Sequence, residues 1–323
     1  MARIVYFAFP NGQLSGGQKM ILRHVETLRE LGFDAVCWQG PANSMPDWMD
    51  HKAPVLVGAP LRPDDILVVP SDAPNGLRQV AAMPQRSLVF CQNQFTFASL
   101  SFEAMDAFDP ARFPTFIGVG PTVEAWVRRA FPQAAVETIP CFADERIFHP
   151  RGERRRAIAF APRKRPLEAA AIRHFFRRVH PAYAKIPWHE LQDAREPEVA
   201  EAFAGSTLFL SLSRLEAVGM TPLEAMASGC ICAGFTGLGG WDFATSENGF
   251  WVAEDDVEAA ADALAQAVEL VAAGGPALQR MQEAGFATAA QWSYAVFRQR
   301  LEEVWARLAP EARLQTRPLD PVA

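Results

Sequence analysis

Long apolar runs are missing from this sequence, although half of its 323 residues are hydrophobic. No stretch comes near the roughly 18 apolar residues that mark a membrane-spanning helix, and the opening residues contain no apolar core of a secretion signal. We therefore expect neither a membrane span nor secretion, and we place the chain in the cytoplasm. The composition is that of a globular protein able to bury full cores.

Positive charge is also in short supply. Lys and Arg number 31 against 37 Asp and Glu, a formal net charge of −6. Nonspecific nucleic-acid binding depends on a positive surface, so we expect no nucleic-acid partner. One segment, residues 151–185, is nevertheless rich in Arg. It has two interpretations: a solvated linker and helix face, or a surface that handles phosphate or makes peripheral contact with the inner face of an anionic membrane.

Cysteine and histidine are few, and neither has the spacing of a metal or redox site. The cysteines number five, and Cys230-Ile-Cys232 has a single intervening residue, which matches neither a zinc knuckle nor a redox pair. We interpret all five as small core residues in a reducing compartment. The histidines are scattered, and His24 and His174, in amphipathic helical segments, are expected at the surface or at the edge of the core.

The G-x-G-x-x-G fingerprint is missing too, which argues against a nicotinamide dehydrogenase. Two aspartate pairs, Asp64-Asp65 and Asp255-Asp256, stand beside strand or helix starts, as turn and cap residues do. We interpret both pairs as structural and predict neither a metal nor a cofactor.

The sequence does contain short apolar strands that alternate with amphipathic helices, the pattern of an α/β fold. In the first half, strands are predicted at residues 3–9, 34–38, 66–70, 87–91, 115–119 and 136–139, with helices such as 18–31 and 121–131 between them. A charged joint with Pro150 and Gly152 then interrupts the pattern. We place the domain boundary there, which divides the chain into residues 1–150 and 151–323.

The second half repeats the alternation. Strands are predicted at residues 157–161, 188–191, 207–212, 231–235 and 249–252, and helices at 167–179, 196–204 and 222–227. Three helical stretches, 257–272, 276–289 and 293–308, close the chain, and the last can pack back on the first domain. The sequence thus predicts two Rossmann-like parallel-sheet domains that face a central cleft, where ligands sit at the carboxyl ends of the strands.

The stretch 211–229 carries most of the functional information. An apolar strand leads into it, Gly219 permits unusual backbone angles, and Pro222 suits the first turn of a helix. The free N–H groups and positive dipole of a helix start form an anion site, and Glu216 and Glu224 flank it. Because ionised Glu only accepts hydrogen bonds, the arrangement suits a ligand with both an anion and hydroxyls, such as a nucleotide sugar. Alternatively, the two glutamates are ordinary partners of the helix dipole.

Two further features fall at predicted strand ends. Arg163 and Lys164 follow the first strand of the second domain, where they either contact a diphosphate in the cleft or form part of the charged surface. Arg165 is expected to face solvent. Gly16 and Gly17 open the first long helix, either as an ordinary strand-to-helix turn or as amides that approach a diphosphate or an acceptor.

Together these motifs resemble the retaining glycosyltransferases of the GT-B fold, specifically family four of the carbohydrate-enzyme classification. Glu216 through Glu224 matches the signature E-x(7)-E with an inner Gly and Pro, and Arg163-Lys164 resembles the basic pair that holds the donor diphosphate. The resemblance covers nearly the whole chain, through Ser15-Gly16-Gly17, the segment 139–148 that resembles the end of the first domain, Gly237-Leu-Gly239-Gly240 and Glu247-Asn248-Gly249.

The sequence departs from the family pattern in two places. Members often carry a His near the end of the fourth or fifth strand of the first domain, whereas Phe-Cys-Gln-Asn-Gln stands here, with Gln92 and Asn93 at its centre. These amides can hydrogen-bond sugar hydroxyls, but they cannot act as a base near neutral pH. Ala217 replaces the Gly that usually follows the first Glu, which implies a tighter approach of the backbone to the sugar.

The resemblance implies that a hexose is moved from a nucleoside-diphosphate donor to a hydroxyl, with retention, in cell-surface glycan synthesis. The acceptor would be a glycan, a lipid-linked sugar or a small molecule. Glu224 would bind the donor ribose, Glu216 would hold the sugar, and Arg163 and Lys164 would neutralise the leaving diphosphate. The other substrate contacts would come from Gly219, Met220 and Thr221 in the second domain and from Gly16, Gly17, Gln92 and Asn93 in the first, acceptor-side domain.

Three alternatives stay open. A GT-B epimerase or phosphorylase would share the fold but use a different site in the first domain. A catalytically silent scaffold that binds a nucleotide sugar is compatible with the replaced His. A nicotinamide dehydrogenase is the alternative that the motifs support least.

Overall fold

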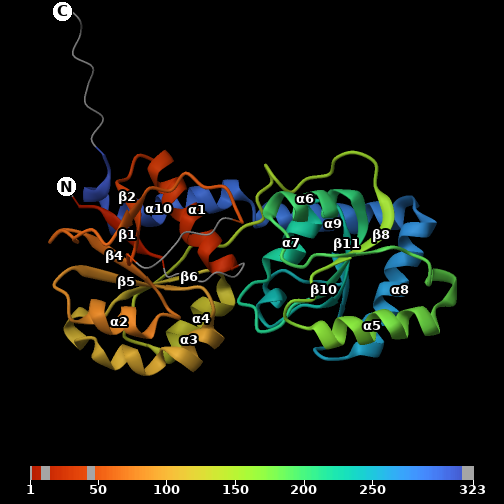
Figure 1. Ribbon diagram of the computed structural model, residues 1–323, viewed down its shortest axis with the longest axis horizontal. Coiled ribbons are helices and arrows are strands. Elements are labelled where there is room, and N and C mark those ends of the chain that lie inside the picture. Colours follow the sequence, from red (N-terminus) through yellow and green to blue (C-terminus); the bar gives the residue numbers. More distant parts are fainter. Residues whose placement is uncertain (1, 9–14, 42–47, 315–323) are drawn as a thin grey trace, which may run out of the picture.

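The computed structural model describes residues 2–8, 15–41 and 48–314, which form two α/β domains side by side (Figure 1). The first domain holds a seven-stranded sheet and the second a five-stranded sheet. All strand pairs in both sheets are parallel. The predicted class, α/β with two parallel-sheet domains, is therefore confirmed.

The first sheet has the strand order β3-β2-β1-β4-β5-β6-β7. Its strands are β1 (Ile4–Phe7), β2 (Ala35–Gln39), β3 (Val55–Val57), β4 (Ile66–Pro70), β5 (Arg86–Cys91), β6 (Thr115–Gly118) and β7 (Val136–Thr138). Its helices are α1 (Gly16–Glu30), α2 (Pro74–Ala81), α3 (Gln94–Leu100) and α4 (Pro121–Ala130), with short 3-10 turns η1 (Phe102–Ala107) and η2 (Pro110–Arg112). Among the strands only β3 was not predicted, because a three-residue edge strand gives too little periodicity. Residues 9–14, the end of the first predicted strand and most of the loop after it, lie outside the described residues.

The second sheet has the order β12-β11-β10-β8-β9. Its strands are β8 (Arg155–Phe160), β9 (Trp188–Glu190), β10 (Ser206–Leu212), β11 (Ile231–Phe235) and β12 (Gly249–Val252). The helices are α5 (Pro166–Val179), α6 (Glu196–Gly205), α7 (Met220–Ala227), α8 (Val257–Ala273), α9 (Gly275–Gln291) and α10 (Tyr294–Leu308), with 3-10 turns η3 (Pro181–Tyr183), η4 (Gly239–Asp242) and η5 (Pro310–Ala312). Each predicted element of this half is present, with ends that shift by at most a few residues.

Helices cover both faces of both sheets (Figure 1). In the first domain α1 and α10 lie on one face and α2, α3 and α4 on the other; in the second, α6, α7 and α9 lie on one face and α5 and α8 on the other. Strand β10 illustrates how alternate residues of a strand pack against the helices on the two faces of the sheet. Leu208, Leu210 and Leu212 pack with α5 and α8, whereas Phe209 packs on the opposite side, because successive side chains of a strand point to opposite faces.

The last helix, α10, returns to the first domain. The Phe297 ring stacks on Phe142 with centroids 4.4 Å apart, and the buried Trp305 ring lies 6.2 Å from that of Tyr6 in β1. Arg300 Nε donates to the carbonyl of Thr138 at 2.9 Å. The end of the chain is thus part of the core around the first sheet.

This return corrects one prediction. His24 in α1 is fully buried, with its ring 4.7 Å from that of Phe90 and 5.0 Å from that of Phe297. Burial lowers the pKa of His24 to about 3. The expected position at the surface or core edge was wrong for His24, because α10 covers a face of α1 that the local pattern leaves open. His174 is exposed, as predicted.

The cysteines lie in the core, as predicted, and one aspartate of each pair, Asp65 and Asp256, makes a structural contact. All five cysteines are buried free thiols. Asp65 forms a buried ion pair with Arg3 (2.7 Å), and the Asp256 side chain caps α8 by accepting from the N–H of Ala259 at 2.9 Å. Within the described residues, no helix combines the length and apolarity that crossing a bilayer requires.

Candidate active site

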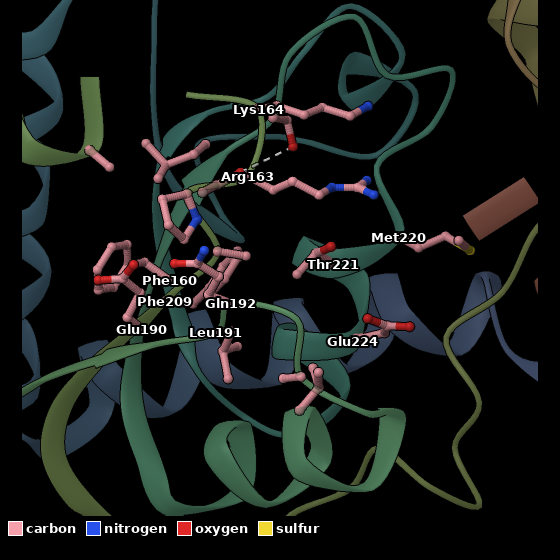
Figure 2. Close-up of a pocket in the computed structure, with 18 of the residues that line it drawn as sticks. Phe160, Arg163, Lys164, Glu190, Leu191, Gln192, Phe209, Met220, Thr221 and Glu224 are labelled. Atoms are coloured by element: carbon pink, nitrogen blue, oxygen red, sulfur yellow. Dashed lines mark hydrogen bonds between the residues drawn. The ribbon is translucent and has the colours of Figure 1, made fainter. Parts of the chain in front are cut away.

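A cavity of about 690 Å³ opens between the domains at the carboxyl ends of β8, β9 and β10. Its walls follow from the topology, because the loops after parallel strands gather at one edge of the sheet. The second domain contributes residues that follow each of these strands, and the first contributes Ser15, Gly16, Lys19, Trp48 and Phe148. Figure 2 shows Arg163 and Lys164 on one side of this space, Thr221 and Glu224 on another, and Phe160, Phe209 and Glu190 together on a third.

Two helix N-termini meet at the cavity. Gly219, with a left-handed φ of 86°, precedes α7, which begins at Met220, two residues before the predicted start at Pro222. Pro222 still lies in the first turn, where its missing N–H costs nothing. At the start of α1, a Cβ on Gly16 would lie 2.5 Å from Met220 Cε. The start of α1 therefore contacts the side chain of the first residue of α7, and the N-termini of both helices favour an anion in the cavity.

The predicted basic pair stands beside these amides. Lys164 Nζ lies 2.6 Å from Glu216 Oε1 and donates to the carbonyl of Arg214 at 3.4 Å. Both side chains of the ion pair are partly exposed, so solvent screens it and a ligand can exchange for either partner at low cost. Arg163 also lines the cavity. Cations, a carboxylate and helix amides thus face one space.

The loop that carries Glu216 is held by the glycines after β11. The N–H of Gly239 donates to the carbonyl of Glu216 at 3.1 Å. A Cβ on Gly239 would lie 1.7 Å from the carbonyl oxygen of Ala217, and one on Gly237, which has a φ of 65°, would lie 3.4 Å from Glu216 Cβ. Only glycine allows this approach, so the Gly237-Leu-Gly239-Gly240 motif fixes the backbone that carries Glu216.

Glu224 differs from Glu216 in its surroundings. It is 7% exposed, and its Oε1 accepts a hydrogen bond from Lys19 Nζ at 2.9 Å. The other oxygen, Oε2, has no hydrogen-bond partner among the described residues, and Glu224 lines the cavity. A ligand hydroxyl can therefore donate to this carboxylate from the cavity side.

Known proteins share this architecture. Residues 190–287 match the family model of the glycosyl transferases group 1. An alpha-1,6-glucosyltransferase of Actinobacillus pleuropneumoniae serotype 7 (strain AP76) is 25% identical over 278 residues, which cover 82% of this chain and 83% of that protein.

Solved structures agree on the fold. Sucrose-phosphate synthase (tll1590) from Thermosynechococcus elongatus superposes with a TM-score of 0.71 at 12% identity, covering 96% of this chain and 100% of that one. Anabaena Alr3699/HepE in complex with UDP-glucose gives 0.70 at 11% identity, over 94% and 99% of the two chains.

The chain has the GT-B fold of these glycosyltransferases, and its residues 190–287 match the glycosyl transferases group 1. Of the residues predicted for its site, the cavity of this transferase brings seven together: Gly16, Arg163, Lys164, Glu216, Met220, Thr221 and Glu224. Gly219 precedes α7 without lining the cavity itself.

The three remaining predicted residues do not line the cavity. Gly17 packs beside Gln92, whose side-chain atoms would lie 3.4 Å from a Cβ on that glycine. Asn93 caps α3: its Oδ1 accepts from the N–H groups of Phe95 and Thr96, and its Nδ2 donates to the carbonyl of Leu215 at 2.8 Å. Its amide is thus engaged with the protein, where it links the first domain to the residue before Glu216.

The expectation that Arg165 faces solvent was wrong. Its side chain is 2% exposed, stacks over Phe235 at 4.6 Å and donates to the carbonyl of Ser213 at 3.1 Å. Glu168, Glu254 and Asp255 surround its guanidinium. A run of three basic residues gives no sign of which one is enclosed; the acids that enclose Arg165 come mostly from the segment after β12.

Sequence reasoning missed several charged and aromatic residues of the cavity, among them Lys19, Trp48 and Glu196. Lys19 and Glu196 are ordinary polar positions in helical segments, and the contact between Lys19 and Glu224 joins residues 205 positions apart. No local pattern marks such a pair. Across the described residues there is also no cluster of three or more His, Cys, Asp or Glu arranged to hold a metal ion.

Proposed function

We propose that this protein transfers a hexosyl residue, glucose in the first instance, from a uridine-diphosphate sugar to a hydroxyl of a carbohydrate acceptor, with retention at the anomeric carbon. One observation carries the proposal: the cavity presents the cations of Arg163 and Lys164, two helix N-termini, and the carboxylates of Glu216 and Glu224 within one space. The choice of uracil and glucose draws on the UDP-glucose complex of the Anabaena protein and on the glucosyltransferase relative.

Each part of the donor meets a matching group. The diphosphate would lie against Arg163, Lys164 and the α7 amides, because charge-assisted hydrogen bonds to phosphate are the strong ones. Glu224 would accept from the ribose hydroxyls, and Glu216 from the sugar hydroxyls. Phe160 and Phe209 offer an apolar wall for the base.

The chemistry then needs a stabilised leaving group. The bond between the anomeric carbon and the β-phosphate oxygen breaks, and the electron pair passes to the diphosphate, whose charge Arg163 and Lys164 neutralise. The acceptor hydroxyl attacks from the face that the diphosphate leaves, which retains the configuration, and its proton passes to the departing phosphate. We propose that these cationic groups suffice and that the reaction requires no added metal or cofactor.

The acceptor would enter from the first domain, where Ser15, Gly16 and Trp48 line the cavity. We propose that it is a glycan, a lipid-linked sugar or a small molecule used in cell-surface glycan synthesis. The corresponding location is the cytoplasm or the inner membrane face, reached by peripheral contact through the basic surface of residues 151–185.

Titration calorimetry with UDP tests the donor site. In Glu224→Gln the ribose hydroxyls lose a charged acceptor whose hydrogen bonds contribute about 1.5–3 kcal/mol, so affinity should fall about tenfold or more. Glu258→Gln, at an exposed position in the first turn of α8, is the matched control and should bind as the unmodified protein does. Equal affinity of Glu224→Gln and the control would remove the ribose role.

A further inference from the structure

Lys19 of the first domain reaches into the donor side of the cavity. Its Nζ lies 2.9 Å from Glu224 Oε1 in α7 and 2.6 Å from Glu196 Oε1 in α6. All three side chains are more than nine-tenths buried. A single ammonium group from α1 thus joins two carboxylates of the second domain.

The surrounding charges show that this ammonium is shared. One helical turn further along α1, Arg23 donates to Glu196 Oε2 at 3.0 Å and to Glu26 at 2.8 Å. Glu196 therefore has two cationic partners, whereas Glu224 has an ion pair only with Lys19 among the described residues. Burial opposes the charged form of Lys19, but Glu224 and Glu196 outweigh it, so that the pKa of Lys19 is raised above its usual value.

We infer that Lys19 is a positioning residue of the donor site, which fixes the Glu224 carboxylate for the ribose hydroxyls and is itself anchored by Glu196. The inference rests on the proposed role of Glu224 in donor binding. The ion pair occupies Oε1 and leaves Oε2 to the cavity, so Lys19 determines where the accepting oxygen points without contacting the ribose.

The other ionisable groups around Glu224 do not replace Lys19. Arg163, Lys164 and Glu216 line the same cavity, and Lys164 is paired with Glu216. Burial raises the pKa of the Cys141 thiol to about 12, which keeps that neighbour uncharged. Without Lys19, the buried carboxylates of Glu196 and Glu224 would face each other with no ammonium between them.

The first experiment compares UDP with 2′-deoxyuridine diphosphate by calorimetry. The unmodified protein should prefer UDP, because only UDP carries both ribose hydroxyls. Lys19→Met should weaken UDP binding by about tenfold or more and should lose most of that preference. Lys19→Arg keeps the positive charge and should recover part of the UDP affinity and part of the preference for UDP. Unchanged preference in Lys19→Met overturns the inference.

The second experiment repeats the UDP titrations at about pH 6 and about pH 8. In Lys19→Met, repulsion between the carboxylates of Glu196 and Glu224 favours proton binding by one of them. UDP affinity should therefore fall more steeply with decreasing pH than in the unmodified protein. Lys19→Met/Glu196→Gln removes one of the two carboxylates and should lose this extra pH dependence while binding UDP weakly. A loss of affinity with an unchanged pH profile would indicate a purely structural role and overturn the inference.

The outcomes separate the inference from the proposed function. If the unmodified protein binds neither nucleotide, the proposed function is wrong. If it binds UDP and Lys19→Met binds with the same affinity, preference and pH profile, only the inference is wrong. Thermal unfolding checks that each variant folds. Should Lys19→Met fail to fold, the double variant takes its place, because Glu224 then no longer faces a second buried carboxylate. An unchanged UDP affinity in the double variant would contradict the inference.

Discussion

At the scale of single residues, Lys164 Nζ and Glu216 Oε1 lie 2.6 Å apart. The proposed donor would separate them, since the diphosphate is the better partner for Lys164 and the sugar hydroxyls are partners for Glu216. The pair is partly exposed, so breaking it costs little. The ion pair between Lys164 and Glu216 is therefore compatible with separate roles for the two residues when the donor is bound.

Lys164→Ala tests the diphosphate role. Its affinity for UDP should fall about tenfold or more, whereas affinity for uridine should stay nearly the same, because the partner of Lys164 is the phosphate charge. Arg156→Ala, at an exposed position near the opposite end of β8, should bind both ligands as before. Equal losses for UDP and uridine would point instead to a folding defect or a base contact.

His24 predicts a pH dependence of stability. Its pKa is lowered to about 3 in the folded protein by burial, against about 6.5 in an unfolded chain. Between these values the unfolded state binds a proton that the folded state does not. The stability contributed by neutral His24 is therefore complete above about pH 6.5 and is lost as the pH falls, by up to about 1.4 kcal/mol per pH unit.

Urea unfolding of His24→Gln between about pH 6.5 and about pH 4.5 measures this contribution. A Gln amide can still pair with the Tyr6 hydroxyl, which lies 2.9 Å from His24 Nδ1. As the pH falls, the free energy of unfolding should decrease less steeply for the variant than for the unmodified protein. The difference between the two slopes should correspond to about one proton. Identical slopes would show that His24 does not remain neutral in the folded protein.

At the scale of elements, the approach of η4 to the loop after β10 positions Glu216. A Cβ on Gly239 would overlap the carbonyl of Ala217, so Gly239→Ala should move the loop and cost at least about 1–3 kcal/mol of unfolding free energy. Turnover should fall with it. Gly205→Ala is the control, because a Cβ there meets nothing within 4 Å. Unchanged stability and turnover in Gly239→Ala would mean that this contact does not hold Glu216.

The elements also show where local sequence patterns succeed and where they stop. Strands β4, β11 and β12 begin and end at the predicted residues, because each is an apolar run between clear breaks. The failures depend on distant partners. α10 buries His24, and the segment after β12 encloses Arg165. The motif residues of the cavity could be predicted because their spacing is local, whereas Lys19 and Glu196 could not, since the fold alone brings them to Glu224.

At the scale of the whole molecule, contacts between the domains surround the cavity. Lys19 binds Glu224 and Glu196, the Asn93 amide donates to the Leu215 carbonyl, and Thr122 Oγ1 donates to Asp242 at 2.6 Å. The second-domain residues of the cavity are thus tied to the first domain at several points, and in the proposed reaction these contacts would bring donor and acceptor to one space and exclude water from between them.

Release of UDP from UDP-glucose is the measurement that tests this account most directly. The unmodified protein, with candidate acceptors and with or without a chelator, should release UDP, including slow hydrolysis when no acceptor is added, and the chelator should leave the rate nearly intact. Glu216→Ala should bind UDP normally but release it from UDP-glucose far more slowly. UDP-glucose that binds tightly without any release, alone or with every acceptor, would contradict the transferase mechanism and favour a nucleotide-sugar-binding scaffold.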